Sequence, residues 1–328
     1  MVNDINPAQL SDIRILAVND IYLFDKKYAS SISKYFSLGV HNALKPSLLF
    51  EKYHPENGNR CFDWCIGIEV SPPHNWHSSL ILCAKMLSDA CESENVLDLH
   101  TAHVLAFILP IFVNGQPDCS IEDSFVHNYI SPLLSSVFSS DPLLNMKWAK
   151  GKLANDSNAS YKPDFQVFNL SGSVKCIVLI AEFKHSEQNS YVESDLLKLG
   201  KQMKLTLNKL ISDGINNPKV CGVHREGLNL NTYVMDLISP KVYRMINVAK
   251  VKLFVNLDQI SLLPRVLAHL ICLKNIALET SQKIENVIVS GCATLKRPAP
   301  SPPLSWLLKN PKTKKKIRQS INQIAKRS

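Results

Sequence analysis

The sequence predicts an α/β protein in which helices flank a mixed central sheet, with an N-terminal α+β region and a disordered basic tail. Two extended runs, residues 164–170 and 175–181, are joined by the small polar turn Ser171-Gly172-Ser173, which favours a β-hairpin. Apolar residues then recur at helical spacing over residues 192–211. From residue 291 onward, prolines and basic residues replace this pattern, as is typical of linkers and tails.

The chain divides into three expected segments: an N-terminal region at residues 1–115, an α/β domain at residues 116–290, and a linker with a basic tail at residues 291–328. Its 328 residues, 45% of them hydrophobic, suffice for two modest domains or one elaborated domain. Residues 1–115 either form a separate small domain or pack onto the α/β core. The sequence assigns them no function.

The N-terminal region is expected to contain a strand at residues 62–70 and a helix at residues 78–90. The strand is predicted because apolar residues alternate along it, which leaves Asp63 and Glu69 on the solvent side. The longest apolar run, residues 102–113, is too short to span a bilayer, and residues 1–12 are too polar for a secretory signal. We therefore expect a soluble protein without membrane contact.

The nine cysteines are scattered and odd in number, which favours reduced thiols in an intracellular protein. Cys61, Cys65, His74 and His77 form the one arrangement that resembles a set of zinc ligands. Their spacing matches no established zinc template and overlaps the predicted strand, so the sequence disfavours a zinc site.

The residues with the clearest chemistry lie at the ends of the predicted hairpin. Asp164 begins the first run, and Glu182 and Lys184 end the second. Side chains alternate across a strand, so Glu182 and Lys184 should project from one face. If the runs pair about Gly172, Asp164 lies near Ile180 and diagonally adjacent to Glu182. Two carboxylates and an amine would then gather at one end of a buried sheet.

Such a cluster suits metal-assisted hydrolysis of a phosphodiester. Neighbouring carboxylates resist joint ionisation unless a cation lies between them, and oxygen ligands favour Mg²⁺ or Mn²⁺. The metal would polarise the phosphate and lower the pKa of a bound water. Lys184 would orient that water or stabilise the charge that develops on the phosphate.

At these positions the chain resembles the PD-(D/E)XK nuclease superfamily, which has the restriction-endonuclease-like fold. The matching residues are Pro163-Asp164 and Glu182-Phe183-Lys184, and the resemblance covers roughly residues 118–260. It implies that Asp164, Glu182 and the backbone carbonyl of Phe183 bind the metal, while Lys184 assists catalysis. Many members carry a further acid on the preceding helix, and Glu122 is the candidate here.

Each of these residues also has a purely structural interpretation. Glu182 and Lys184 could form an ion pair at a strand end, where exposed pairs contribute little to stability. Asp164 could simply shape the entry to its strand. Glu122 lies beside Ser120 and Asp123, which together make a helix-capping box.

The helix expected at residues 192–211 carries leucines and Met203 on one face and a row of polar residues on the other. That row consists of Lys198, Lys201, Gln202, Lys204 and Lys209. It is either a solvated face or a ridge that contacts nucleic-acid phosphates beside the site.

Beyond this helix, strands are predicted at residues 219–224 and 232–238 with a loop between them, and a shorter pair at 242–246 and 251–255. A helix is expected over residues 257–284, where Pro264 indicates an early kink or a late start.

Positive charge is concentrated in the tail. Residues 291–328 hold ten Lys and Arg and no acid, so 27 basic and 28 acidic residues remain in the rest of the chain. The run at residues 312–318 is typical of a nuclear-localisation or nucleic-acid-binding segment. Its basic residues are Lys312, Lys314, Lys315, Lys316 and Arg318. A solvated tail without a partner is the alternative.

The sequence thus predicts a nuclear, Mg²⁺-dependent endonuclease that acts on DNA and reaches the nucleus by an import receptor. The alternative is a catalytically inactive nuclease fold that binds nucleic acid or protein, because fold does not determine function. The near-neutral charge of residues 1–290 weakens the enzymatic interpretation. Strand preference and oligomeric state stay open.

Overall fold

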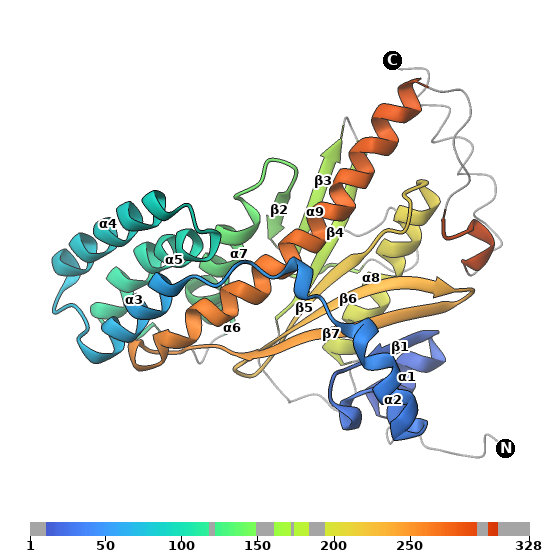
Figure 1. Cartoon of the computed structure of the whole chain (residues 1–328), viewed down its shortest axis with the longest axis horizontal. Coiled ribbons are helices and arrows are strands. Elements are labelled where there is room, and N and C mark those ends of the chain that lie inside the picture. The colour runs from blue at the N-terminus through green and yellow to red at the C-terminus, as the bar shows by residue number, and fades with distance from the viewer. Residues whose placement is uncertain are drawn as a thin grey trace.

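The computed structural model describes residues 11–117, 122–148, 161–171, 174–183, 194–293 and 301–307. These residues form an α/β protein with a mixed, open seven-stranded sheet that helices flank (Figure 1). The strand order is β1-β7-β6-β5-β4-β3-β2. The α/β class with a mixed sheet flanked by helices, as predicted, is therefore confirmed.

The strands meet in both orientations. β1 pairs with β7 and β4 pairs with β5 in parallel, and the other neighbours are antiparallel. The strands are β1 (Ile21–Phe24), β2 (Asn145–Trp148), β3 (Phe165–Ser171), β4 (Val174–Glu182), β5 (Val220–Glu226), β6 (Asn229–Ser239) and β7 (Val242–Lys252).

Helices pack on both faces of the sheet. Cys221 donates its Sγ hydrogen to Leu273 O of α9, whereas the next residue, Gly222, faces Met203 of α8. Since consecutive residues of a strand point to opposite faces, α8 and α9 lie on opposite sides. The helices are α1 (Asp12–Val18), α2 (Leu38–Leu44), α3 (Asn59–Val70), α4 (Trp76–Ser93), α5 (Val96–Val113), α6 (Glu122–Phe125), α7 (Ser131–Phe138), α8 (Asp195–Ser212) and α9 (Leu263–Ala293).

The strand predicted at residues 62–70 is wrong, because this segment is helix α3. Cys61, Cys65 and Ile68 face the core at helical spacing, whereas Phe62, Ile66 and Val70, which the alternating pattern placed on one face with Ile68, are exposed. A nearly all-apolar segment satisfies both periods, so tertiary contacts decide between them. Glu69 is also not simply solvent-facing, since its Oε1 accepts a hydrogen bond from Ser261 N at 2.8 Å.

The C-terminal half differs from the prediction mainly in loop lengths. β5 and β6 are joined by the tight turn Gly227-Leu228, in which Gly227 has φ +59°, so the loop predicted at residues 225–231 was too long. The two short strands expected at residues 242–255 are one continuous strand, β7. α9 begins at Leu263 after a short 3₁₀ turn, which confirms the late start indicated by Pro264.

The region before residue 116 packs onto the sheet. β1 extends the sheet at β7, and one hydrophobic core runs from Leu16 to Ile284. Two segments, Val96–Val113 and Leu257–Ile288, are long and apolar enough to cross a membrane, but most of each is buried inside the protein. Burial in a shared core accounts for their hydrophobicity.

Candidate functional site

In the β3–β4 hairpin Asp164 lies opposite Glu182. The sequence predicted a longer separation, with Asp164 near Ile180 and only diagonally adjacent to Glu182. Ser171 pairs with Val174, so the register differs by one residue from pairing about Gly172. Val167 pairs with Leu179 and Phe168 with Ile177, which leaves Val178 as an extra, bulged residue. Together these shifts move the residue opposite Asp164 from Ile180 to Glu182.

Asp164 is tied to the end of β4 by two hydrogen bonds. Its backbone N donates to Ala181 O at 3.1 Å, and its Oδ2 accepts from Phe183 N at 2.8 Å. Phe183 is buried, with its ring centroid 6.2 Å from that of Trp148. The Asp164 carboxylate is therefore held in place by backbone that is itself fixed in the core.

Glu182 is fully buried, with an exposed fraction of 0%. Its Oε1 accepts from Gln202 Nε2 at 2.7 Å, and its Oε2 accepts from Lys198 Nζ. Burial raises the pKa of the Glu182 carboxyl to about 7, and the nearby Asp164 charge adds to this, although Lys198 opposes it. The site thus holds a carboxyl group that is part-protonated at neutral pH.

Lys198 and Gln202 reach Glu182 because they lie one helical turn apart on α8. Ser194 caps this helix, its Oγ accepting from Leu197 N at 3.3 Å. Burial opposes the ammonium charge of Lys198, but its bond to Glu182 and the charge of Asp164 outweigh this and raise the lysine pKa. The Oε1 atom of Gln202 is buried without a hydrogen-bond partner in the described structure.

Most side chains of the polar row predicted on α8 are engaged within the protein and are not free to contact a nucleic acid. Gln202 is fully buried, which corrects its predicted place among exposed lysines. Lys204 donates to Asn19 O at 2.5 Å and pairs with Asp20, and Lys209 pairs with Asp213 at 2.6 Å. Lys201 is half-buried and also makes an interaction within the protein. Lys204 thus attaches α8 to the segment between α1 and β1, whereas Lys209 pairs with the capping residue of its own helix.

Several predicted site residues lie outside the described residues. They are Lys184, the side chain of Glu122 at the start of α6, and the tail residues Lys312, Lys314, Lys315, Lys316 and Arg318. Their roles stay predictions.

The oxygen donors present suit a hard divalent cation. Asp164 and Glu182 come from adjacent strand ends, and the Phe183 carbonyl follows directly. Within the described parts of the chain, no three His, Cys, Asp or Glu side chains form a metal-binding group. The donor set fits a cation held by two carboxylates, provided that the cation replaces Lys198 as the partner of Glu182.

The role of Lys198 and Gln202 as partners of Glu182 was missed from the sequence. A signal was present, because Gln202 lies three residues after the buried Leu199 and directly before the buried Met203. A polar residue on the apolar face of a helix needs a buried partner. An acid at the end of the preceding strand is one such partner.

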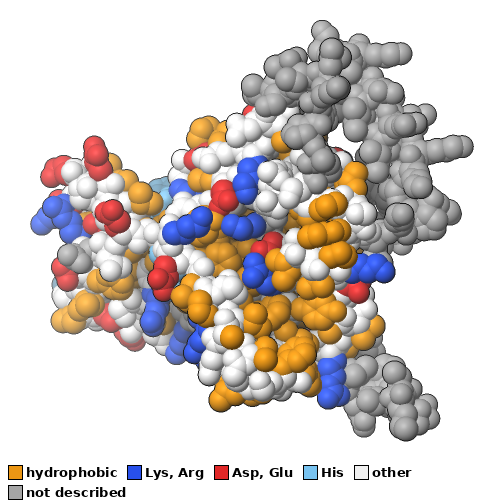
Figure 2. Space-filling model, turned by 45° about the vertical axis from the view of Figure 1, so that its right-hand side comes forward, with side chains coloured by type: hydrophobic (Ala, Val, Ile, Leu, Met, Phe, Trp, Pro, Cys, Tyr) orange, Lys and Arg blue, Asp and Glu red, His pale blue; other side chains and the backbone are white. Residues whose placement is uncertain are grey.

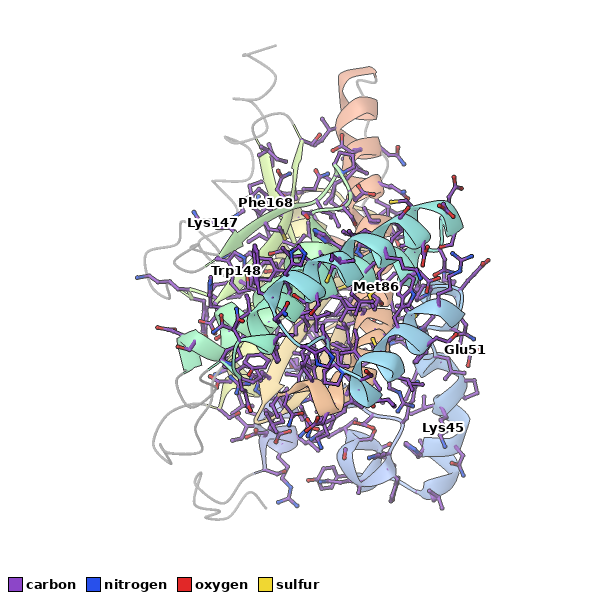
Figure 3. All side chains as sticks on the ribbon, turned by 90° about the vertical axis from the view of Figure 1, so that its left-hand side faces the viewer. Lys45, Glu51, Met86, Lys147, Trp148 and Phe168 are labelled. Carbon is purple, nitrogen blue, oxygen red and sulfur yellow. The ribbon has the colours of Figure 1, made fainter. Side chains whose placement is uncertain are left out.

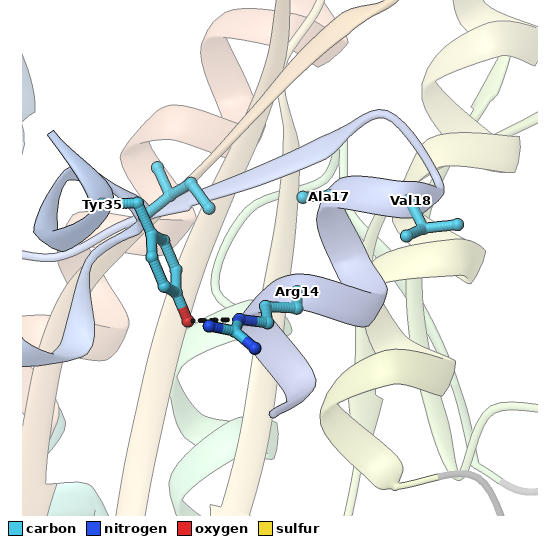
Figure 4. A pocket seen from close by; sticks show the side chains of 5 residues that line it. Arg14, Ala17, Val18 and Tyr35 are labelled. Atoms are coloured by element: carbon cyan, nitrogen blue, oxygen red, sulfur yellow. Dashed lines mark hydrogen bonds between the residues drawn. The ribbon is translucent and has the colours of Figure 1, made fainter. Parts of the chain in front are cut away.

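The two best-defined surface cavities of the described residues lie elsewhere than the acid pair. A surface cavity of about 390 Å³ is lined by Arg14, Ala17, Val18, Ile32 and Tyr35, far along the chain from the acid pair. In it, Arg14 Nε donates to Tyr35 Oη at 3.2 Å (Figure 4). On the face shown in Figure 2, basic and acidic side chains are interspersed beside a broad apolar area.

No family model, no curated protein and no solved structure matches this chain.

Proposed function

We propose that this protein is a metal-dependent nuclease that hydrolyses phosphodiester bonds, with DNA as the expected substrate. The observation that carries the proposal is the meeting of Asp164 with Glu182 at adjacent strand ends, where Glu182 has a raised pKa. Perturbed carboxyl groups in close pairs are common at catalytic sites. The PD-(D/E)XK pattern in the sequence agrees with the same two residues.

Asp164, Glu182 and the Phe183 carbonyl would hold Mg²⁺ or Mn²⁺, with Glu122 as a further acid. A bound cation would polarise the phosphate and lower the pKa of a water molecule. The chain itself contributes orientation: Phe183 N fixes Asp164, and Gln202 Nε2 fixes Glu182. Lys184 is proposed as the amine that stabilises charge on the phosphate.

Cleavage of supercoiled plasmid and of labelled single strands, with Mg²⁺ or Mn²⁺, tests the proposal. Asp164→Asn, Glu182→Gln and Lys184→Ala should each lower the rate by about 100-fold or more, because each removes charge or a ligand at the reacting centre. Asp213→Asn is the matched control, since Asp213 pairs with Lys209 on α8 away from the acid pair. Activity that survives the Asp164 and Glu182 substitutions would refute the assignment.

A second candidate function is that of a non-catalytic module that binds nucleic acid or protein. It is favoured because both carboxylate oxygens of the fully buried Glu182 already accept hydrogen bonds, one from Gln202 and one from Lys198. This candidate predicts neither cleavage nor Mn²⁺ binding by calorimetry, with intact folding. Salt-sensitive binding to DNA would then identify the ligand as nucleic acid.

We also propose that residues 312–318 direct the protein to the nucleus through an import receptor. Replacing the five basic residues of this run by glutamine should shift a fluorescently tagged protein to the cytoplasm. Unchanged nuclear accumulation would contradict the proposal.

A further inference from the structure

A pair of lysines and an aromatic ring lie together on the β2–β3–β4 part of the sheet. Lys175 on β4 donates from Nζ to Gln166 Oε1 at 2.8 Å, and the same Nζ lies 4.2 Å from the ring centroid of Phe168. Lys147 on β2 pairs in register with Gln166. Figure 3 labels Lys147 and Phe168 close to each other on these strands. We call Lys147, Phe168 and Lys175 the hairpin face.

The hairpin face is on the side of the sheet that carries the acid pair. Asn169 and Ser171 donate to Glu285 of α9, so Phe168, which directly precedes Asn169 on β3, points away from α9. Gln166, which Lys175 contacts, lies two residues after Asp164 and therefore shares its face. The main contacts of α8 on this side are with β4, β5 and β6. The hairpin face thus continues from the acid pair beyond the edge of α8.

Its two cations lack counter-charges in the described structure. Lys147 and Lys175 are both exposed, and neither forms an ion pair with a described carboxylate. Partial burial of Lys175 and then the charge of Lys147 lower the pKa of Lys175. The two ammonium groups therefore repel each other. In contrast, Lys198, Lys204 and Lys209 on α8 all pair with acids of the protein itself.

We propose that the hairpin face binds a single-stranded segment of nucleic acid and, where the proposed nuclease function holds, leads it to Asp164 and Glu182. Lys147 and Lys175 contact consecutive phosphates, and a base stacks on Phe168. A single strand is the occupant because Lys175, whose ammonium lies over the half-buried Phe168 ring, can turn to a phosphate and leave that ring face to a base, whereas a duplex hides its base faces. Two lysines without counter-charges complement the phosphate backbone.

The test measures the anisotropy of a fluorescein-labelled oligo(dT) without metal, with the full-length protein carrying Asp164→Asn to prevent cleavage. Lys147→Glu/Lys175→Glu should weaken binding at least about tenfold and lower the slope of log affinity against log salt by about 1.4, twice the single-strand value per phosphate. Phe168→Ala should weaken binding about tenfold with little change in slope. Lys209→Glu, on the exposed part of α8, is the control and should leave affinity within about twofold.

Several results would overturn the inference. These are a wild-type protein that binds no oligo(dT), a double variant with unchanged affinity, or tighter binding to a duplex than to the single strand. Because Phe168 is half-buried, each variant is first checked by thermal melting, and Lys147→Glu alone supplies a substitution at an exposed position. Binding is scored without metal or cleavage. The binding test therefore remains valid if the nuclease assay fails. Nuclease activity that the double substitution does not change would refute only the proposed binding by the hairpin face.

Discussion

Glu182 is the residue whose surroundings most constrain an interpretation of the site. A fully buried carboxyl group is costly unless hydrogen bonds and a counter-charge offset the loss of water. Lys198 supplies the charge, and Gln202 supplies a neutral donor. The remaining raised pKa shows that burial is only partly offset. Replacing the ammonium by a divalent cation would satisfy the same carboxylate together with Asp164.

Stability should fall with rising pH because of Glu182. The folded protein keeps the proton of Glu182 up to about pH 7, whereas the unfolded chain loses it near the ordinary pKa of 4.5. Between these values the folded state binds more protons, so its free energy of unfolding decreases as pH rises, by about 3 kcal/mol for a shift of this size. Glu182→Gln should abolish this decrease, as urea unfolding at about pH 5 and about pH 8 would show.

Glu226→Gln is the control for that experiment, because Glu226 forms an exposed pair with Lys250. This variant should keep the decrease in stability between the two pH values. An equal pH dependence in Glu182→Gln and in the wild type would contradict the assignment of the effect to Glu182.

Removing the ammonium of Lys198 should expose the competition between lysine and metal. Lys198→Met should destabilise the metal-free protein by about 2 kcal/mol, since it leaves a buried carboxyl without its cation. Mn²⁺ should then raise the Tm of this variant more than that of the wild type, because the metal no longer has to displace Lys198. Differential scanning fluorimetry with and without Mn²⁺ measures both effects. Lys209→Met should change stability by less than about 0.5 kcal/mol, and an equal metal-induced rise in the Lys198 variant and wild type would argue against exchange.

At the scale of elements, the position of α8 on β5 decides whether Lys198 and Gln202 can reach Glu182. A Cβ atom at Gly222 of β5 would lie 2.5 Å from Met203 Sδ, and one at Gly200 of α8 would lie 2.7 Å from Leu16 Cδ2. Gly222 allows α8 to approach the sheet closely, and Gly200 allows α1 to approach α8. The acid pair therefore depends on backbone packing as well as on its own side chains.

Gly222→Ala should separate α8 from β5 and destabilise the protein by about 1–3 kcal/mol, as overpacking of a core does. Gly67→Ala is the matched control, since a Cβ at this position of helix α3 meets no atom within 4 Å. It should stabilise the helix by about 0.5–1 kcal/mol. Chemical denaturation of both variants provides the measurement. A Gly222 variant as stable as the wild type would show that Met203 can move aside without loss of stability, which would contradict the prediction.

At the scale of the molecule, segments far apart in the sequence complete the same sheet and core. β1 adds a parallel strand beside β7, and helix α5 is mostly buried against α7 and α9. Tyr53 donates to Glu279 of α9, and Lys219 Nζ donates to Tyr53 Oη at 2.9 Å. Residues 301–307 also contact the sheet, with Lys241 N donating to Trp306 O at 3.1 Å.

A fragment that starts at residue 116 should therefore fail to fold by itself. It would lose β1 from the sheet edge and expose the apolar surfaces of α7 and α9 that α5 covers. We expect it to be insoluble or to lack a cooperative thermal transition, whereas the full chain unfolds cooperatively. A soluble fragment with a sharp transition would show that residues 1–115 are a separate domain.

Local sequence was sufficient for the hairpin, for α8 and for the two acids at the strand ends, and Pro264 indicated the late start of α9 as one of two alternatives. Turn residues, helical periodicity and proline act over a few neighbouring residues, so their effects can be read without the fold. Contacts between distant segments decided the rest. The core made residues 62–70 a helix, the bulge at Val178 aligned Asp164 with Glu182, and packing of α8 turned Lys198 and Gln202 inward. Burial and pairing are set by partners that lie far away in the chain, and only the tertiary structure brings those partners together.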